Sequence, residues 1–191
     1  MKDKIILASQ SPRRKQLLEW AEVPFEIIVV PTDENFPDGM PVEEVAIHIA
    51  MHKGEAVKAT LQNASNQIIL AADTIVVLNG KVIGKPKDRN DAIEILASLS
   101  GNKHTVITGV VILYGNTVIS FAESTDVTFH PLTKTQIEFY IDKYQPYDKA
   151  GAYAIQEWIG VVGIKSIKGD FYNVMGLPVS RVVQELGKLV E

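Results

Sequence analysis

The sequence predicts an α/β protein with a mixed sheet, and two observations carry that prediction. Short apolar runs of strand length alternate with segments of helical periodicity, and Gly- and Asn-containing turns separate them. The middle of the chain, roughly residues 75–130, is rich in alternating apolar and polar residues that are typical of antiparallel strands. We therefore expect one domain over residues 1–191, in which the β-rich segment forms a second lobe.

The elements are expected in a mixed order. Strands are predicted at residues 5–8, 25–30, 68–72, 105–113, 117–129 and 161–167, with a hairpin over 75–83 that turns at Asn79-Gly80. Helices are predicted at 12–21, 42–61, 90–99 and 133–144, and from about residue 178. Ser11 before Pro12 and Thr133 before its helix are suitable N-caps.

Composition excludes several classes of protein. Hydrophobic residues make up 46% of the 191 residues and charged residues 22%, as in ordinary soluble domains. No apolar run approaches the ~20 residues that span a bilayer, and the apolar run near the start is too short for a signal peptide, so we expect a cytoplasmic protein without membrane attachment. The net charge of −4 argues against stable nucleic-acid binding, and the absence of cysteine excludes disulfides and thiolate chemistry.

The stretch LASQSPRRKQLL, residues 7–18, places two arginines in the first turn of a predicted helix. Helix N-termini already carry partial positive charge, so cations there are unfavourable unless an anion compensates them. A polyphosphate at the start of this helix, contacting Ser9, Arg13 and Arg14, would remove the conflict. The alternative without a ligand, a solvated helix start with Arg14 paired to a carboxylate, is about equally compatible with the sequence.

Other charged residues fall in unusual places. Lys53 lies in the middle of the apolar face of the 42–61 helix, where it either snorkels to water or borders a cleft. Lys85, in Gly84-Lys85-Pro86-Lys87, would ordinarily be a surface turn. Asp73 follows the predicted strand 68–72 as Ser9 follows the first strand, at the sheet edge where α/β proteins place ligands, although capping a turn is the simpler explanation for Asp73.

Together these residues suit phosphoryl chemistry. Arginine and lysine donate to phosphate oxygens, while Mg²⁺ prefers one or two carboxylates and leaves its other positions to water and phosphate. Asp73 and Glu34, the latter in an acidic loop, are the candidate metal ligands. A carboxylate beside an activated water can orient it or take its proton.

These segments resemble the Maf family of nucleoside triphosphate pyrophosphatases. The resemblance covers almost the whole chain and rests on four stretches: residues 7–18, AADTIVVLNGKVIGKPKD at 71–88, DKAGAYAIQ at 148–156 and GDFYNVMGLPVSRV at 169–182. It implies a strongly twisted mixed sheet flanked by helices, with two lobes around a central cleft, as in inosine triphosphatase-like proteins. It also implies hydrolysis of a nucleoside triphosphate to the monophosphate and pyrophosphate with Mg²⁺ or Mn²⁺.

The resemblance also implies roles for individual residues. Asp73 is the expected catalytic acid, Glu34 assists the metal or the water, and the phosphate site comprises Ser9, Arg13, Arg14, Lys53 and Lys85. The Tyr153–Gln156 pattern looks like the branch acting on dTTP and UTP, in which Arg13, Thr74 and Gln156 govern the choice of substrate. A glutamine amide offers donors and an acceptor to the imide edge of thymine or uracil. Glu157-Trp158 departs from the small residue that members often carry there.

Three alternatives stay open at this point. A phosphotransferase would use the same basic pocket, although the chain lacks the GxxxxGK[ST] phosphate loop. A nucleotide-binding regulator of cell division without turnover is a second, since the Maf family is also associated with division arrest. A pyrophosphatase of different base preference is the third, and the sequence also leaves a homodimer open.

Overall fold

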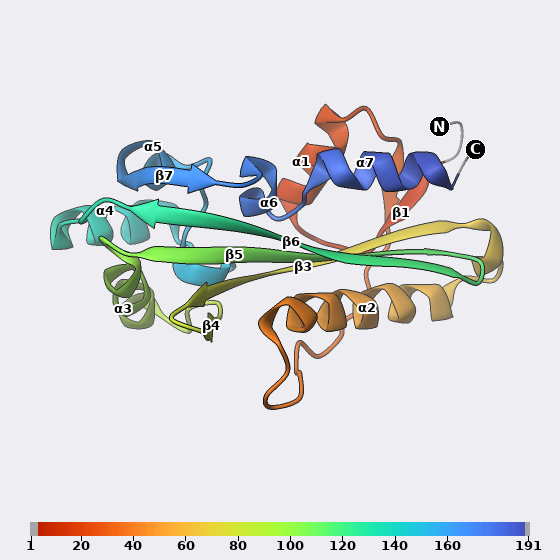
Figure 1. Ribbon diagram of the computed structural model, residues 1–191, viewed down its shortest axis with the longest axis horizontal. Helices are drawn as coiled ribbons and strands as arrows, with labels where there is room; N and C mark the ends of the chain where they lie inside the picture. The colour runs from red at the N-terminus through yellow and green to blue at the C-terminus, as the bar shows by residue number, and fades with distance from the viewer. Residues whose placement is uncertain (1–3, 190–191) are drawn as a thin grey trace. The chain divides into compact units, whose positions relative to one another are not determined.

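The computed structural model describes residues 4–189 and contains a mixed set of strands and helices (Figure 1). The strands are β1 (Ile5–Leu7), β2 (Phe25–Ile27), β3 (Ile68–Leu78), β4 (Lys81–Ile83), β5 (Lys103–Tyr114), β6 (Thr117–Phe129) and β7 (Ile164–Lys168). The α-helices are α1 (Pro12–Trp20), α2 (Val42–Thr60), α3 (Arg89–Leu99), α4 (Lys134–Tyr144), α5 (Trp158–Gly163), α6 (Phe171–Met175) and α7 (Val179–Lys188). Two 3₁₀ turns, η1 (Ala64–Asn66) and η2 (Ala150–Ala152), complete the order.

The strands form one 7-stranded sheet in the order β2-β1-β3-β5-β6-β7, with β4 paired to β3. Strand β1 runs parallel to both β2 and β3, whereas β4 is antiparallel to β3 and β7 is antiparallel to β6. The expected mixed sheet flanked by helices is therefore confirmed, while the expected cleft between two lobes stays a prediction. None of the helices within residues 4–189 combines the length and apolar character needed to cross a bilayer.

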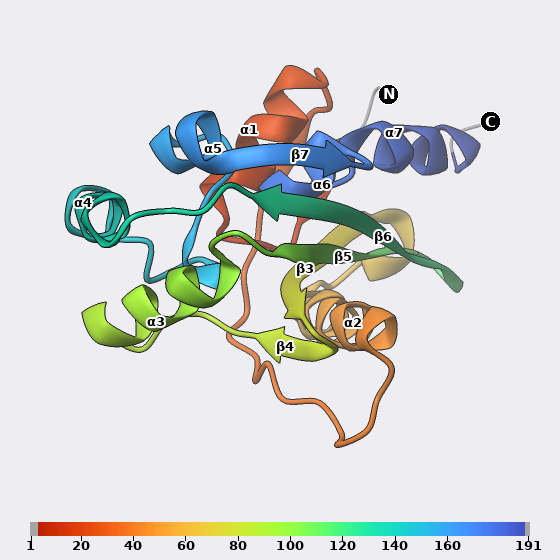
Figure 2. The ribbon, with the colours of Figure 1, turned by 60° about the vertical axis from the view of Figure 1, so that its left-hand side comes forward.

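The chain divides into two compact units. Unit 1 comprises Met1–Thr74, Thr108–Glu123 and Gly176–Glu191. Within it, α2 lies on one side of the strands, and α1 and α7 lie on the other (Figures 1 and 2). The core between α2 and the strands is apolar and includes Ala50 and Val57 of α2 and Ile69 and Ala71 of β3.

Gly109 explains how closely α2 approaches the sheet. A Cβ atom at Gly109 would lie 2.2 Å from the backbone carbonyl carbon of Ala46, so only glycine allows β5 to pass the helix at this distance. The helix is thereby held against the strand, which fixes the position of every side chain that α2 directs toward β3.

Unit 2 comprises Ile75–Ile107 and Ser124–Met175. Helices α3 and α4 pack against each other, and the 3₁₀ turn η2 packs against α3. The buried Asn173 on α6 donates to the Val106 carbonyl and to the Thr125 hydroxyl, at 3.1 and 3.0 Å. These bonds attach the short helix α6 to strands β5 and β6.

Local sequence signals are confirmed where they involve near neighbours. The Ser11 hydroxyl caps α1 by accepting from the Arg14 N–H, and Thr133 forms a capping box with Gln136. The predicted turn at Asn79-Gly80 has positive φ at both residues, as a tight hairpin turn requires.

Several predicted boundaries are wrong, among them that of the strand expected over 25–30, which ends at Ile27. The strand expected to end at Ala72 continues to Leu78, so Asp73 lies inside β3 and does not cap a turn. Residues 161–163, predicted as strand, belong to α5, and β7 begins only at Ile164. A run of valine favours a strand locally, but tertiary context overrides that preference.

Candidate functional site

Arg14 is the centre of a buried polar cluster in unit 1. Its side chain comes from the first turn of α1, and the residue is 8% exposed. The guanidinium donates to the Gly176 carbonyl at 2.7 Å through Nε, to the Ser9 hydroxyl at 3.0 Å through Nη1, and to the Thr74 hydroxyl at 3.0 Å through Nη2. One side chain thus ties three segments of the chain together.

Burial sets the charge state of this arginine. Loss of solvent lowers the pKa of Arg14 from 12.5 to about 10, the negative charge of Asp73 opposes that effect, and the neighbouring Arg13 adds to it. Arg14 is therefore still a cation at neutral pH, and its cost of burial is partly offset by the nearby carboxylate. A buried cation beside a second, half-buried arginine is an arrangement that an anion would stabilise.

Lys53 forms the second cluster, on α2. Its ammonium group donates to Asp73 Oδ1 at 2.6 Å and to Glu34 Oε1 at 2.8 Å. The side chains of Lys53 and Asp73 are 18% and 11% exposed. The ammonium of this lysine lies between two carboxylates, one from β3 and one from the loop before α2.

The two clusters meet at adjacent residues of one strand. Asp73 contacts Lys53, and Thr74 contacts Arg14. Because successive side chains of a strand point to opposite faces, the two clusters lie back to back on β3. Ser9 lies beyond the carboxyl end of β1, as expected, but Asp73 reaches the site from within β3.

The remaining predicted residues are Arg13, Lys85 and Gln156. Arg13 follows Pro12 on α1 and is half-buried. Lys85 and Gln156 belong to unit 2 and are both exposed, Lys85 in the loop before α3 and Gln156 in the loop before α5. Unit 1 therefore gathers Ser9, Arg14, Glu34, Lys53, Asp73 and Thr74 around one stretch of β3.

The carboxylates suit a metal that is bound together with its substrate. No group of three or more His, Asp or Glu side chains within residues 4–189 could hold a metal ion by itself. Glu34 and Asp73 nevertheless converge on a single cationic nitrogen, so their oxygens can share one positive charge. Mg²⁺ commonly takes only one or two carboxylates and completes its shell with water and phosphate, which this pair fits.

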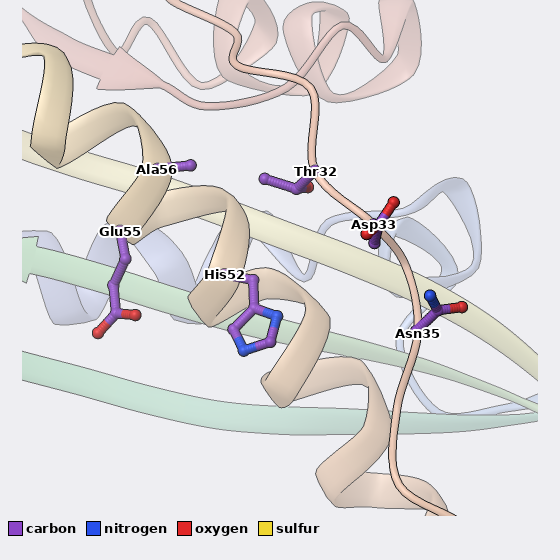
Figure 3. Close-up of a pocket in the computed structure, with 6 residues that line it drawn as sticks. All are labelled: Thr32, Asp33, Asn35, His52, Glu55 and Ala56. Atoms are coloured by element: carbon purple, nitrogen blue, oxygen red, sulfur yellow. The ribbon is translucent and has the colours of Figure 1, made fainter.

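A hollow of about 530 Å³ is lined by residues of the same loop and of α2 (Figure 3). Figure 3 shows the loop running beside α2, with Thr32 directed toward Ala56. The lining residues are Thr32, Asp33, Asn35, His52, Glu55 and Ala56. None of the predicted site residues is among them, although Glu34 and Lys53 are neighbours in sequence of residues that are.

Two residues of the Arg14 cluster were not predicted from the sequence. The Thr108 hydroxyl of β5 lies 2.9 Å from the Thr74 hydroxyl, and the Gly176 carbonyl accepts from Arg14. Gly176 has a φ of 112°, a conformation that other residues rarely adopt. Its place in the tail stretch 169–182 was the available signal, whereas nothing in the sequence marked Thr108.

The fold and the clusters define an α/β protein with a buried cation and a carboxylate–lysine centre on one strand. The family model described as "Maf-like protein" matches residues 4–189, and the chain therefore belongs to the Maf-like family.

Curated relatives extend over nearly the whole chain. A Cytophaga hutchinsonii protein named dTTP/UTP pyrophosphatase is 51% identical over 185 residues, covering 97% of this chain and 84% of that protein. A Bacteroides thetaiotaomicron protein with the same name is 46% identical over 189 residues, covering 98% and 97%. Among solved structures, the Ham1 protein of Staphylococcus aureus aligns with a TM-score of 0.45 and 16% identity over 66% of this chain and 72% of that one, a likeness too distant to carry an argument.

Proposed function

We propose that this protein is a nucleoside triphosphate pyrophosphatase that hydrolyses dTTP and UTP to the nucleoside monophosphate and pyrophosphate. The observation that carries this proposal is the identity of 51% and 46%, over nearly the full chain, to two proteins named dTTP/UTP pyrophosphatase. The lysine between two carboxylates supports it, because such a centre can bind a metal-loaded phosphate chain and activate water.

In this proposal Asp73 is the catalytic residue. Its carboxylate orients the attacking water and accepts its proton, while a new bond forms from the water oxygen to the α-phosphorus and the bond to the bridging oxygen of pyrophosphate breaks. When bound, a divalent cation supplies Lewis-acid charge to the phosphate oxygens and lowers the pKa of a water. Lys53 holds the Asp73 and Glu34 carboxylates in place before substrate arrives.

The cations stabilise the negative charge of the phosphate chain. Arg13 and Lys85 donate to phosphate oxygens directly, and Lys53 adds its charge beside Asp73. Arg14 contributes its charge and fixes the hydroxyl of Ser9, which then contacts phosphate.

Base selection falls to Arg13, Thr74 and Gln156. The Gln156 amide pairs with the imide edge of thymine or uracil through one donor and one acceptor. The Thr74 hydroxyl is held by Arg14 and by the neighbouring Thr108, so its direction is set before a nucleotide binds.

A triphosphate panel tests the activity. Purified protein with Mg²⁺ or Mn²⁺ should convert dTTP and UTP to monophosphate and pyrophosphate, and prior removal of divalent cations with EDTA should stop turnover. Release of inorganic phosphate together with the nucleoside diphosphate, or transfer of a phosphoryl group to an acceptor, would contradict the proposal. Binding without turnover of any triphosphate would favour the regulator of cell division.

Asp73→Asn tests the catalytic assignment. The amide keeps the size of the side chain but cannot take a proton at neutral pH, so we expect turnover to fall by about a hundredfold or more. Asp142→Asn is the matched control, because Asp142 is an exposed carboxylate of unit 2 that pairs with Arg89. Wild-type turnover in Asp73→Asn would remove Asp73 from the mechanism.

Lys53→Met tests the lysine in the same assay. Methionine retains an apolar side chain of similar length and removes the ammonium, so a lysine that only covers the core would be replaced without loss. We expect turnover to fall strongly because Asp73 and Glu34 lose their shared partner. We further propose a cytoplasmic protein that does not bind nucleic acid stably. A homodimer stays open as an alternative to a monomer, and a measurement of molar mass in solution by light scattering would decide between them.

A further inference from the structure

Gln156 is the exposed residue at the end of a buried run in unit 2. Residues 151–155 are buried, Tyr153, Ala154 and Ile155 being 6%, 4% and 4% exposed, and Gln156 then emerges into solvent. The N–H of Glu157 donates to the Ala154 carbonyl at 3.1 Å, so the chain turns at this point and presents the glutamine at the tip.

Tyr140 holds both sides of this turn. It lies on α4, is fully buried, and its hydroxyl accepts from the Ala154 N–H at 3.1 Å. The same hydroxyl donates to the Glu157 carboxylate. A single phenol oxygen thus bridges the residue two before Gln156 and the residue directly after it.

Glu157 is held from a second direction as well. Lys149, which is 8% exposed, places its ammonium 3.8 Å from Glu157 Oε1, and the Glu157 carbonyl accepts from the Gly160 N–H at 2.9 Å. Glycine is required at 160, because a Cβ there would lie 1.7 Å from the Ile155 carbonyl oxygen. The residue that departs from the usual small residue of the family therefore has a defined set of partners.

We propose that Tyr140 and Glu157 are positioning residues for base selection, because together they fix the turn that carries the Gln156 amide. The proposal rests on the proposed role of Gln156 as the base reader. Hydrogen bonds to a base edge depend on direction, and a turn anchored on both sides of Gln156 keeps its amide aimed at one place. Without these anchors the turn samples other conformations, and pyrimidine selection weakens although Gln156 is still present.

Tyr140→Phe is the first test, since it removes one hydroxyl and retains the buried ring. We expect kcat/KM for UTP relative to kcat/KM for GTP to fall about tenfold, as for the loss of a hydrogen bond to a charged group. Tyr144→Phe is the matched control: Tyr144 is one turn further along α4, and its ring stacks on that of Tyr140 at 5.0 Å. That control should leave the ratio unchanged.

Glu157→Gln and Glu157→Ala form a second pair. Glutamine still accepts from the Tyr140 hydroxyl, so most of the selectivity should be retained, whereas alanine removes the acceptor and should lower the ratio as Tyr140→Phe does. A purely structural role would reduce the amount of active enzyme and lower both rates equally, leaving the ratio unchanged. Urea unfolding of each variant verifies that the protein is folded during the assay.

Gln156→Ala in the same panel distinguishes the base-reading role of Gln156 from the positioning role of Tyr140 and Glu157. If it lowers the UTP preference while Tyr140→Phe and Glu157→Ala leave the ratio at the wild-type value, the positioning role is overturned and the base reader stands. If Gln156→Ala also leaves the ratio unchanged, the base reader and the positioning role both fail while the pyrophosphatase activity stands. If the wild type releases no pyrophosphate from any triphosphate, the proposed function itself fails.

Discussion

Protonation of His104 should destabilise this protein as the pH falls below neutral. His104 is 2% exposed, its Nε2 lies 2.7 Å from the Tyr153 hydroxyl oxygen, and its ring stacks on Phe129. Its Nδ1 has no hydrogen-bond partner within residues 4–189. A protonated imidazole carries an N–H at both nitrogens, so the charged form would bury a donor without an acceptor.

The size of this loss in stability follows from the lowered pKa of His104. Burial lowers the pKa of His104 from 6.5 to about 4, against the opposing charge of Asp126. Because the unfolded chain binds the proton more tightly than the folded one, stability is fully present above about pH 6.5 and is lost progressively as the pH falls toward 4. At ~1.4 kcal/mol for each pKa unit, the full loss is about 3 kcal/mol, of which about 2.5 kcal/mol is reached at pH 4.5.

Urea unfolding of the wild type and of His104→Gln, measured between pH 7.5 and 4.5, tests this prediction. Glutamine stays neutral and can still hydrogen-bond to Tyr153, so the free energies of unfolding of the two proteins should converge toward acid pH by about 2.5 kcal/mol. His130→Gln, at an exposed histidine, should follow the wild-type curve. Parallel curves for His104→Gln and the wild type would refute the reasoning, since carboxylate titration is common to both.

Four further substitutions have expected outcomes in urea unfolding. Gly109→Ala should cost about 3 kcal/mol because its Cβ would collide with the α2 backbone, whereas Gly187→Ala, in open space on α7, should gain about 0.5 to 1 kcal/mol. Arg14→Lys should cost about 2 kcal/mol and most of the pyrophosphate release, because an ammonium cannot reproduce the three-way fork; undiminished stability would show that this fork is dispensable. Arg89→Ala should leave the free energy of unfolding almost unchanged, since Arg89 and Asp142 are 45% and 55% exposed, and any loss should shrink further in high salt.

Local chemistry made much of the fold predictable. Ser11 and Thr133 mark helix starts because their hydroxyls satisfy N–H groups only three residues away. Asn79-Gly80 marks a turn because both residues tolerate positive φ. The extent of β3 was not predictable in this way, because a charged Asp73 disfavours a strand until Lys53 neutralises it from a helix that precedes it in the sequence.

In the candidate site, too, some features follow from the sequence and others only from the tertiary structure. The sequence by itself predicted which residue types would handle phosphate and metal, and it determined the membership of the Maf-like family and the helix start that carries Arg13 and Arg14. Only the tertiary structure decided that Arg14 and Lys53 serve opposite faces of β3 and that Tyr140 anchors the turn beside Gln156. Such pairings join residues far apart in the chain, and they depend on how closely helices pack against strands, which no local pattern of residues specifies.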